Sequence, residues 1–359
     1  MPITIKYLTQ NQTSLWDKYV HAHPQANLYH LSGWKKVIEN AYNHKTYYLA
    51  AFRDDTQTVM AGILPLVHLK HFIFGNALIS IPFFDMGGIL ADTDEIEKEL
   101  VSAAIELAKS LKADTLELRH THPIAGVEDS SSLFDTATCN VRTHKVRMLL
   151  ELPESSEVLM QSFKSKLRSQ INKPVKEGLE SKIGGKELLD DFYNVFLVNM
   201  RDLGSPVHSK KLLENVLERF NENTKIIIVH KDNQPYAASI VSGFKDTLEN
   251  PWASSLRNYS RLSPNMLLYW AMLEYACDNG YRYFDFGRST PDEGTYKFKK
   301  QWGAKPHPLH WYCFSLNGEP VSEEASEKSK FDTAIQYWQK LPVSITALIG
   351  PMIRKHIGL

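Results

Sequence analysis

Apolar residues recur along the chain at helical and at strand spacings in turn, which predicts an α/β protein. In the N-terminal half, the pattern predicts helices that begin near Thr13, cover Gly33–Tyr42 and run from Asp92 to Ala113. Runs rich in β-branched and aromatic residues predict strands at Lys45–Phe52, Thr58–Leu69 and Thr115–His120. A polar stretch between the first two strands predicts a hairpin.

The C-terminal half repeats this order of elements. It predicts helices at Leu188–Leu203 and Asn265–Asn279, and strands at Lys225–His230, Tyr236–Phe244, Leu248–Leu256 and Tyr281–Phe286. The second helix is apolar on nearly all sides and is followed by Gly280, so we expect a buried helix with a left-handed cap. In each half, a strand with a single acid, Glu117 or Asp285, follows a long helix. We interpret this as an internal duplication, with two unrelated α/β domains as the alternative.

The segment 151–177 joins the two halves and predicts one amphipathic helix. Its apolar residues recur every four positions, at Leu159, Phe163, Leu167, Ile171 and Val175. Pro174 should bend or end this helix. Basic residues dominate positions 164–186, among them Lys164, Arg168 and Lys173. This cluster either binds a polyanion such as tRNA or forms the solvated face of the helix.

The composition narrows the classes of function. The 359 residues suffice for two domains, and 41 basic against 41 acidic residues give no global field for DNA. The three cysteines are widely spaced and form no ligand motif, so we expect free thiols, no disulfide framework and no metal site. We find neither a signal peptide nor an apolar run of transmembrane length, which predicts a soluble cytoplasmic protein.

The segment 284–304 concentrates polar chemistry directly after a predicted strand. Its polar side chains include Asp285, Arg288, Tyr296 and Lys299. In open α/β sheets, sites form beyond the carboxyl ends of strands, and a lysine there can hold a phosphate or stabilise an oxyanion. The composition supports equally a solvated basic loop whose aromatic residues pack inward.

The sequence FDFG…GTYKFKKQWGA in this segment resembles the Tyr-Asp-Phe-Gly-Gly…Gly-Leu…Phe-Lys…Phe-Gly pattern of FemAB-type aminoacyltransferases. Residues 163–178 resemble the Arg…Ile-Lys-Lys-Ala…Gly helix of that family, and residues 31–36 resemble its Gln-Ser-x-x-Trp segment. The segments FGNALISIPFFDMGG and NPWASSLRNYSRLSPNMLLYW are similar to FemAB-related proteins associated with exosortase systems. The resemblance spans roughly residues 28–315.

This resemblance implies two tandem GNAT-like domains, residues 1–150 and 151–320, and a helical tail at 321–359. Each domain would hold a mixed, mostly antiparallel sheet flanked by helices. The implied activity is transfer of an acyl or aminoacyl group to an amine or hydroxyl, on a peptidoglycan, exopolysaccharide or other envelope precursor. The implied donor is an aminoacyl-tRNA or an acyl thioester, with no tightly bound cofactor.

The resemblance also assigns roles to matched positions. Lys299 resembles the lysine that stabilises charge during acyl transfer, and Asp85 resembles an aspartate near the bound precursor. Lys36 resembles a lysine that binds substrate phosphate, with Lys35 as its competitor. Arg288 stands where the family motif has a second glycine, which adds a cation beside the expected site. We expect the acceptor to attack the donor carbonyl directly, with Lys299 as oxyanion partner and Asp85 as base.

Acyl-CoA is the less favoured donor. CoA-dependent GNAT enzymes carry a glycine-rich loop before their central helix, where backbone amides bind the pyrophosphate. The corresponding segment, Leu256–Pro264, contains no glycine, although Arg257 and Arg261 offer side chains for phosphate. A CoA-dependent N-acyltransferase therefore stays an alternative. A non-catalytic accessory of envelope polymer assembly is a third hypothesis.

Three further groups have a functional and a structural interpretation. Trp252, Ser254, Ser255 and Arg257 have the mixed character of a substrate pocket, or of a core tryptophan with capping serines. Tyr193 and Arg201 share a helical face and are candidate substrate contacts. The tail 331–359 combines apolar residues with two terminal cations, which suits packing on the protein or peripheral contact with a membrane.

Overall fold

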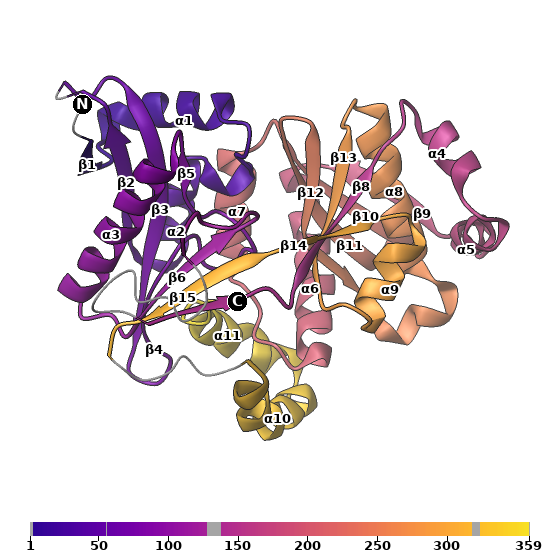
Figure 1. Cartoon of the computed structure of the whole chain (residues 1–359). Coiled ribbons are helices and arrows are strands. Elements are labelled where there is room, and N and C mark those ends of the chain that lie inside the picture. The colour runs from indigo at the N-terminus through magenta and orange to yellow at the C-terminus, as the bar shows by residue number, and fades with distance from the viewer. Residues whose placement is uncertain (1–2, 55, 128–137, 318–323, 359) are drawn as a thin grey trace. The chain divides into compact units, whose positions relative to one another are not determined.

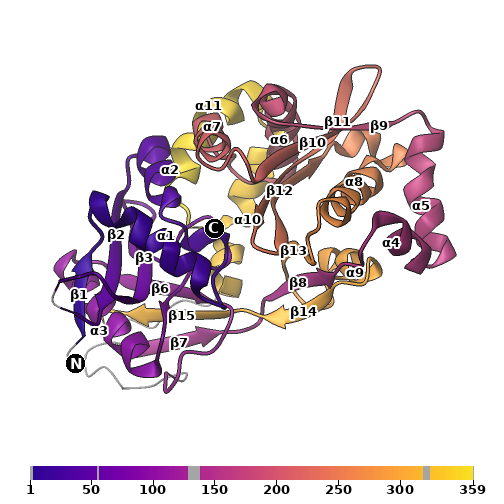
Figure 2. The same cartoon turned by 90° about the horizontal axis from the view of Figure 1, so that it is seen from above.

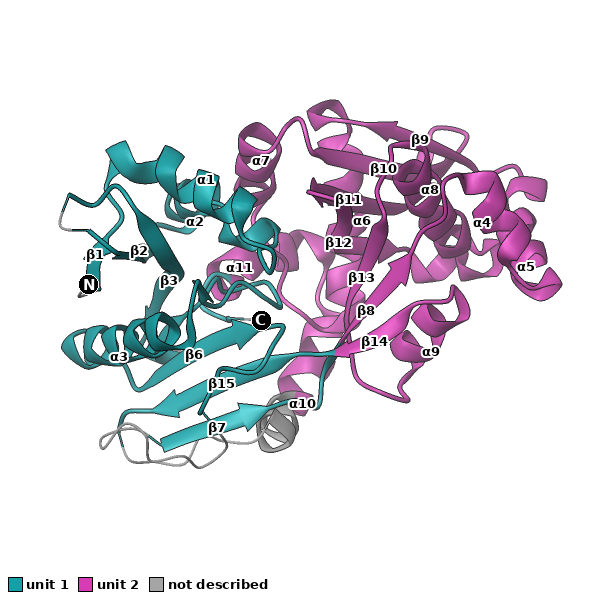
Figure 3. Cartoon of the chain, turned by 45° about the horizontal axis from the view of Figure 1, so that its top comes forward, with its two compact units in different colours: residues 1–146, 308–327, 355–359 teal, residues 147–307, 328–354 magenta. Residues whose placement is uncertain are grey.

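The computed structural model describes residues 3–54, 56–127, 138–317 and 324–358 (Figure 1). The chain divides into two compact units, which Figure 3 distinguishes by colour. Unit 1 comprises residues 1–146, 308–327 and 355–359, and unit 2 comprises residues 147–307 and 328–354. Each unit contains one mixed sheet with helices against it. The predicted fold class, α/β with two tandem sheet domains, is therefore confirmed.

The sheet of unit 1 has the order β1–β2–β3–β4–β6–β15–β7, with β5 paired to β3. Its strands are β1 (Thr4–Tyr7), β2 (Lys45–Phe52), β3 (Met60–His71), β4 (Gly75–Ile79), β5 (Leu90–Ala91), β6 (Thr115–His120), β7 (Thr138–Arg142) and β15 (His310–Ser315). All of these pairs are antiparallel except β4 with β6, which run in parallel.

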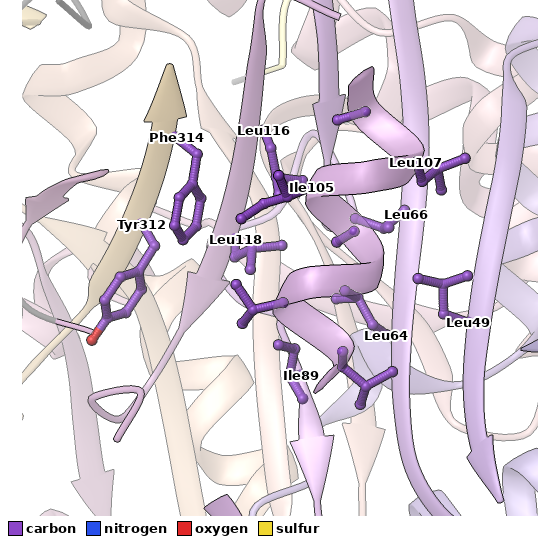
Figure 4. Close-up of a cluster of buried hydrophobic side chains, with 14 of the residues drawn as sticks. Leu49, Leu64, Leu66, Ile89, Ile105, Leu107, Leu116, Leu118, Tyr312 and Phe314 are labelled. Carbon is purple, nitrogen blue, oxygen red and sulfur yellow. The ribbon is translucent and has the colours of Figure 1, made fainter. Parts of the chain in front are cut away.

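Helices pack on both faces of this sheet, because its central strands carry apolar side chains on both faces. The helices are α1 (Thr13–Ala22), α2 (Gly33–Tyr42) and α3 (Asp94–Ser110). On one face, Tyr48 of β2 packs against Trp16 of α1 with ring centroids 5.1 Å apart. On the other face, Leu49 joins the core beneath α3, where Phe314 of β15 also packs (Figure 4).

The sheet of unit 2 has the order β14–β8–β13–β12–β11–β10–β9. Its strands are β8 (Val146–Glu151), β9 (Glu180–Gly184), β10 (Thr224–Lys231), β11 (Gln234–Phe244), β12 (Thr247–Ser255), β13 (Tyr283–Ser289) and β14 (Lys305–Pro308). The strands β9 to β12 form an antiparallel meander, whereas β12 and β13 are parallel.

Figure 2 shows α6 and α7 on one face of this sheet and α8 on the other. The helices here are α4 (Ser156–Ser162), α5 (Ser165–Lys176), α6 (Leu189–Leu203), α7 (Lys210–Arg219), α8 (Pro264–Asp278), α9 (Gly294–Gln301), α10 (Glu324–Lys340) and α11 (Val343–Arg354). α8 is buried on nearly all sides, and Gly280 follows it with φ +77°, as predicted. It lies between the sheet and the pair α4 and α5.

The two sheets have the same strand order, which supports the predicted duplication. In each, a meander leads to a strand that pairs in parallel with the strand after a long helix, and the last paired residue is Glu117 or Asp285. The strand beyond β6 or β13 in each sheet differs from what the sequence predicts. β15 follows β14 in the chain but pairs with β6, and β8 follows β7 but lies beside β13. Residues 308–317 therefore belong to unit 1 rather than to the second domain.

The prediction of a single helix between the two halves is wrong. Two helices, α4 and α5, replace it, because Phe163 adopts an extended backbone and packs its ring against Trp270 and Trp302. Val175 lies outside the apolar stripe and is 54% exposed. The helix expected from Asp92 begins later, because Thr93 is its N-cap and accepts the Ile96 N–H. All three cysteines are free and buried.

We predict that Gly62→Ala destabilises the protein by about 1–3 kcal/mol, since the packed core cannot admit a methyl group there. A Cβ at this position would lie 2.8 Å from Ile96 Cγ2 and 3.2 Å from the Leu90 carbonyl oxygen. Urea unfolding measures the change in free energy. Gly294→Ala is the control, because its Cβ would meet no atom within 4 Å. Equal stabilities of the two variants would contradict this packing argument.

Candidate functional site

The strands β12 and β13 pair over only a short stretch. Their register covers Thr247 with Tyr283, Leu248 with Phe284 and Glu249 with Asp285. β12 continues to Ser255 and β13 to Ser289 without further pairing to each other. Beyond Asp285, the backbone groups of the two strands therefore do not form a ladder with each other. This is the place where the sequence predicts a site.

Asp285 is buried at the end of the paired stretch, where it is 1% exposed. One carboxylate oxygen forms an ion pair with Arg147 Nε at 2.5 Å, and the other accepts the Gly287 N–H at 2.8 Å. Gly287 has φ +74°, a conformation that glycine adopts without a steric penalty. The carboxylate thus holds the turn in β13 and offsets the charge of Arg147.

Lys299 reaches the same turn from α9. Its ammonium donates to the carbonyl oxygens of Gly287 at 3.0 Å and Arg288 at 2.8 Å, and the residue is 7% exposed. Aromatic packing fixes α9, since Phe298 lies edge-on to Tyr269 with ring centroids 4.9 Å apart. Burial raises the pKa of Tyr269 to about 12, so its phenol stays protonated. Lys299 therefore places a positive charge at the end of β13.

The other residues predicted for this site, on β12 and α9, differ in their burial and in their contacts. Tyr296 is half-buried, and Lys300 Nζ lies 5.7 Å from its ring centroid. Trp252 is buried beside His208, and the buried Ser254 accepts a hydrogen bond from Asn199 Nδ2 at 3.0 Å.

Ser255 ends β12, and Arg257 is exposed in the 3₁₀ helix Arg257–Leu262. The contact of Ser254 with Asn199 was not predicted, since no sequence pattern connects these two residues.

Tyr193 and Arg201 both connect α6 to other segments of unit 2. The Tyr193 hydroxyl donates to the His208 carbonyl oxygen at 3.0 Å. Arg201 forms an ion pair with Asp202 at 2.7 Å and donates to the Leu341 carbonyl oxygen at 3.0 Å. Both side chains thus make contacts that hold the fold.

The basic residues of α5 and its start are exposed. Lys164, Arg168 and Lys173 all lie at the surface, and Lys173 Nζ donates to the Arg261 carbonyl oxygen at 2.6 Å. Their exposure suits both interpretations made from the sequence, a polyanion site and a solvated helix face. In the tail, Leu348 and Met352 of α11 are exposed and Arg354 is buried against His208.

In unit 1, Asp85 lies in a constrained segment that follows β4. Ile81 and Phe83 have φ of +46° and +78°, which is costly for residues with bulky side chains. The buried Arg119 holds this segment by donating to the Phe84 carbonyl oxygen at 2.5 Å. Trp311 Nε1 donates to the Asp85 carbonyl oxygen at 2.9 Å. The Asp85 side chain itself is half-buried.

Lys35 and Lys36, the two candidates for binding a substrate phosphate, differ in their contacts and exposure. Lys35 is engaged in an ion pair with Glu39 at 2.5 Å, whereas Lys36 is exposed. Lys36 is therefore the more accessible cation of the two.

The sequence did not identify a group of histidines in unit 1. His120 ends β6, His122 follows two residues later, and Glu97 of α3 lies close to both. Burial lowers the pKa of His120 well below its usual value and that of His30 to about 3, so both imidazoles are neutral at pH 7. The His-Thr-His spacing was an available signal, because residues two apart on an extended chain share a face.

The comparisons add a family to this geometry. Residues 161–300, which include α5 to the last turn of α9, match the family described as acetyltransferase (GNAT) domain. The chain carries a GNAT-type acyltransferase domain. No curated protein sequence matches the chain. Among the described residues, no helix combines the length and the apolar character needed to cross a bilayer.

Solved structures show that the GNAT-type fold extends over both units. The crystal structure of FemX has 15% identity and a TM-score of 0.63, over 93% of this chain and 100% of that one. A tandem GNAT protein from the clavulanic acid biosynthesis pathway has 12% identity and a TM-score of 0.54, over 89% and 100% of the two chains. L-PGS from Bacillus licheniformis has 11% identity and a TM-score of 0.51, over 96% and 98%.

We predict that Arg147→Met lowers the free energy of unfolding by about 3–5 kcal/mol, because it leaves the Asp285 carboxylate buried without its cation. The double variant Arg147→Met, Asp285→Asn should recover much of this loss, since it removes the uncompensated charge. Urea unfolding of the four proteins in the cycle measures both effects. Additive losses in the double variant would contradict an ion pair between the two residues.

Proposed function

We propose that this acyltransferase moves an aminoacyl or acyl group from an activated donor to an amine or hydroxyl acceptor, in the assembly of a cell-envelope or exopolysaccharide precursor. The observation that supports it is the end of β12–β13 pairing beside the buried Lys299 ammonium. Backbone groups and a fixed positive charge at one place suit the binding of a carbonyl on which negative charge develops. The GNAT domain supplies the class of reaction.

The neighbours in structure support an aminoacyl donor. FemX shares the fold over the whole of its chain, and the C-terminal domain of a putative lysylphosphatidylglycerol synthetase from Agrobacterium fabrum shares it over 96% of that domain's chain. The second name denotes a lysyl group joined to a lipid. We therefore place aminoacyl-tRNA first among the donors, with an acyl thioester second. In either case, the donor binds transiently and no tightly held cofactor is needed.

The start of α8 also favours this choice over acyl-CoA. A pyrophosphate cradle needs backbone N–H groups that point to the ligand at a helix start. Here the first residue, Pro264, has no N–H, and the Met266 N–H donates to the Ser263 carbonyl oxygen at 3.0 Å. Ser263 itself has φ +59° and makes no side-chain cap. The exposed cations Lys164, Arg168 and Lys173 would then receive the tRNA backbone.

We propose separate roles for the residues of the two units. The acceptor attacks the donor carbonyl carbon, the oxyanion forms beside Lys299, and collapse expels the donor's hydroxyl or thiol group. For unit 1, Asp85 is the proposed base and Lys36 is the proposed ligand of a substrate phosphate. Asp285 acts as a positioning residue, because both of its oxygens are used by Arg147 and Gly287.

For the remaining contacts, the proposal follows the exposure of each residue. Arg288, Tyr296, Ser255 and Arg257 are accessible enough to contact a substrate. Trp252, Ser254, Tyr193 and Arg201 would act indirectly, through the contacts within unit 2 that are described above. The C-terminal segment 331–359 packs on the protein through Arg354, while its exposed Leu348 and Met352 suit a peripheral contact with a membrane.

We predict that the purified protein binds charged tRNA saturably and binds acyl-CoA weakly. A competition titration at fixed salt measures both, because the affinity for a polyanion depends strongly on salt. The double variant Lys164→Ala, Arg168→Ala should weaken tRNA binding. Lys210→Ala and Lys211→Ala, on another helix, provide a charge-matched control. Tight CoA binding without tRNA binding would instead favour the CoA-dependent alternative.

We predict that Lys299→Met lowers kcat by about 10²–10³-fold, the usual effect of losing one oxyanion donor. Lys299→Arg should retain more activity because it keeps the charge. Lys300→Met, the neighbouring exposed lysine, is the control and should leave kcat unchanged. A thermal melt separates this effect from loss of the two carbonyl contacts. Full activity in a folded Lys299→Met enzyme would contradict the catalytic role.

A further inference from the structure

The end of β6 in unit 1 brings two imidazoles and a carboxylate together. Glu97, His120 and His122 each offer one ligand atom, and these atoms all lie within 4.8 Å of one another. Within this group, His122 Nε2 lies 3.7 Å from Glu97 Oε1. A tetrahedral ion about 2.0–2.1 Å from each ligand would hold ligand atoms about 3.3 Å apart. Small side-chain rotations therefore suffice to close the set around an ion.

The protein alone satisfies only some of the polar atoms of this group. Within the described part of the chain, the Nδ1 atoms of His120 and His122 are both buried and have no hydrogen-bond partner. Buried polar atoms of this kind are rare in folded proteins, because each loses its hydration without compensation. His120 is 2% exposed and Glu97 is 7% exposed. Coordination to a cation would satisfy the imidazoles and offset the buried carboxylate together.

The surroundings hold the three side chains in place. The Ala125 N–H donates to Glu97 Oε2 at 3.3 Å, which orients the carboxylate and leaves its other oxygen toward His122. The Ile89 N–H donates to His120 Nε2 over 3.3 Å, which is a long and therefore weak bond. Gly88 lies flat against this imidazole, since a Cβ there would come within 2.5 Å of Nε2. Such supporting contacts are typical around metal ligands.

We propose that Glu97, His120 and His122 bind one divalent transition-metal ion of the zinc class. Two imidazoles and one carboxylate are ligands that Zn²⁺ accepts, and three protein ligands leave a fourth position open. Both ligand histidines also line a narrow crevice, together with Asn27, His30, Gly87 and Gly88.

The proposal is independent of the proposed acyl transfer and differs from the expectation, made from the cysteines, that the chain has no metal site. The ion joins the start of α3 to the end of β6. It lies next to the segment that carries Asp85, because the Gly87 N–H donates to the Arg119 carbonyl oxygen at 3.1 Å. Its first role is therefore to hold this part of unit 1.

The test uses the full chain, stripped of metal with a chelator and then titrated with Zn²⁺ against a chromophoric competitor. We expect one ion per chain, and a melting temperature that rises with the concentration of Zn²⁺. Co²⁺ in place of Zn²⁺ should give the visible absorption of a tetrahedral site with nitrogen and oxygen ligands. Failure to bind one equivalent of either metal would overturn the proposal.

Variants locate the site. Glu97→Gln and His122→Gln should each weaken Zn²⁺ binding by more than about 100-fold, beyond the usual loss for an outer contact. His21→Gln, an exposed histidine of α1, is the matched control and should bind as the unmodified chain does. Metal-free Glu97→Gln should melt no lower than the metal-free parent, because it removes a buried charge. Unchanged Zn²⁺ affinity in both ligand variants would also overturn the proposal.

Discussion

A buried charge needs an opposite charge beside it, and in both sheets this requirement falls where parallel pairing ends. In unit 2, Asp285 is the last residue of β13 that pairs with β12, and it binds Arg147 at 2.5 Å. In unit 1, Glu117 is the last residue of β6 that pairs with β4, and it binds Arg119 at 2.6 Å. Removing one partner of such a pair leaves a charge in a medium that solvates it poorly. Each pair therefore fixes the backbone just beyond the parallel pairing, next to the proposed sites.

Different side chains lie next to the two ion pairs, although the pairs occupy equivalent positions in their sheets. Beyond Asp285, the chain turns at Gly287, and its carbonyl groups face the Lys299 ammonium. Beyond Glu117, the buried Arg119 binds the Phe84 carbonyl oxygen and so fixes the strained segment before Asp85, while His120 ends the strand. A duplicated scaffold thus presents a cation in one unit, and a carboxylate with imidazoles in the other. The proposed acyl transfer rests on side chains such as Lys299 and Asp85, because the fold alone supports many reactions.

Each sheet contains a strand that the order of the chain would place in the other sheet: β15 lies in the sheet of unit 1, and β8 lies in the sheet of unit 2. β15 pairs with β6 through six residues, and its Tyr312 and Phe314 fill the core beneath α3. Tyr312 also accepts the Ile124 N–H at 2.8 Å, which holds the loop after the histidines. Trp311, on the same strand, packs over Arg119 with its ring centroid 4.6 Å from Cζ. A strand that comes late in the chain therefore supports groups from its first half.

The sequence by itself determined most of the elements and the class of the protein. Helix and strand periodicities are local, so β2, α2 and β6 have the bounds that the pattern predicts, and the motif that contains Asp285 and Lys299 indicated the right family of folds. Only the tertiary structure decided which strand pairs with which, that Arg147 is the partner of Asp285, and that Glu97 lies near His120 and His122. These contacts join residues far apart in the chain, and no periodic pattern records them. Strand exchange in particular leaves every local preference unchanged, which is why only the folded chain shows it.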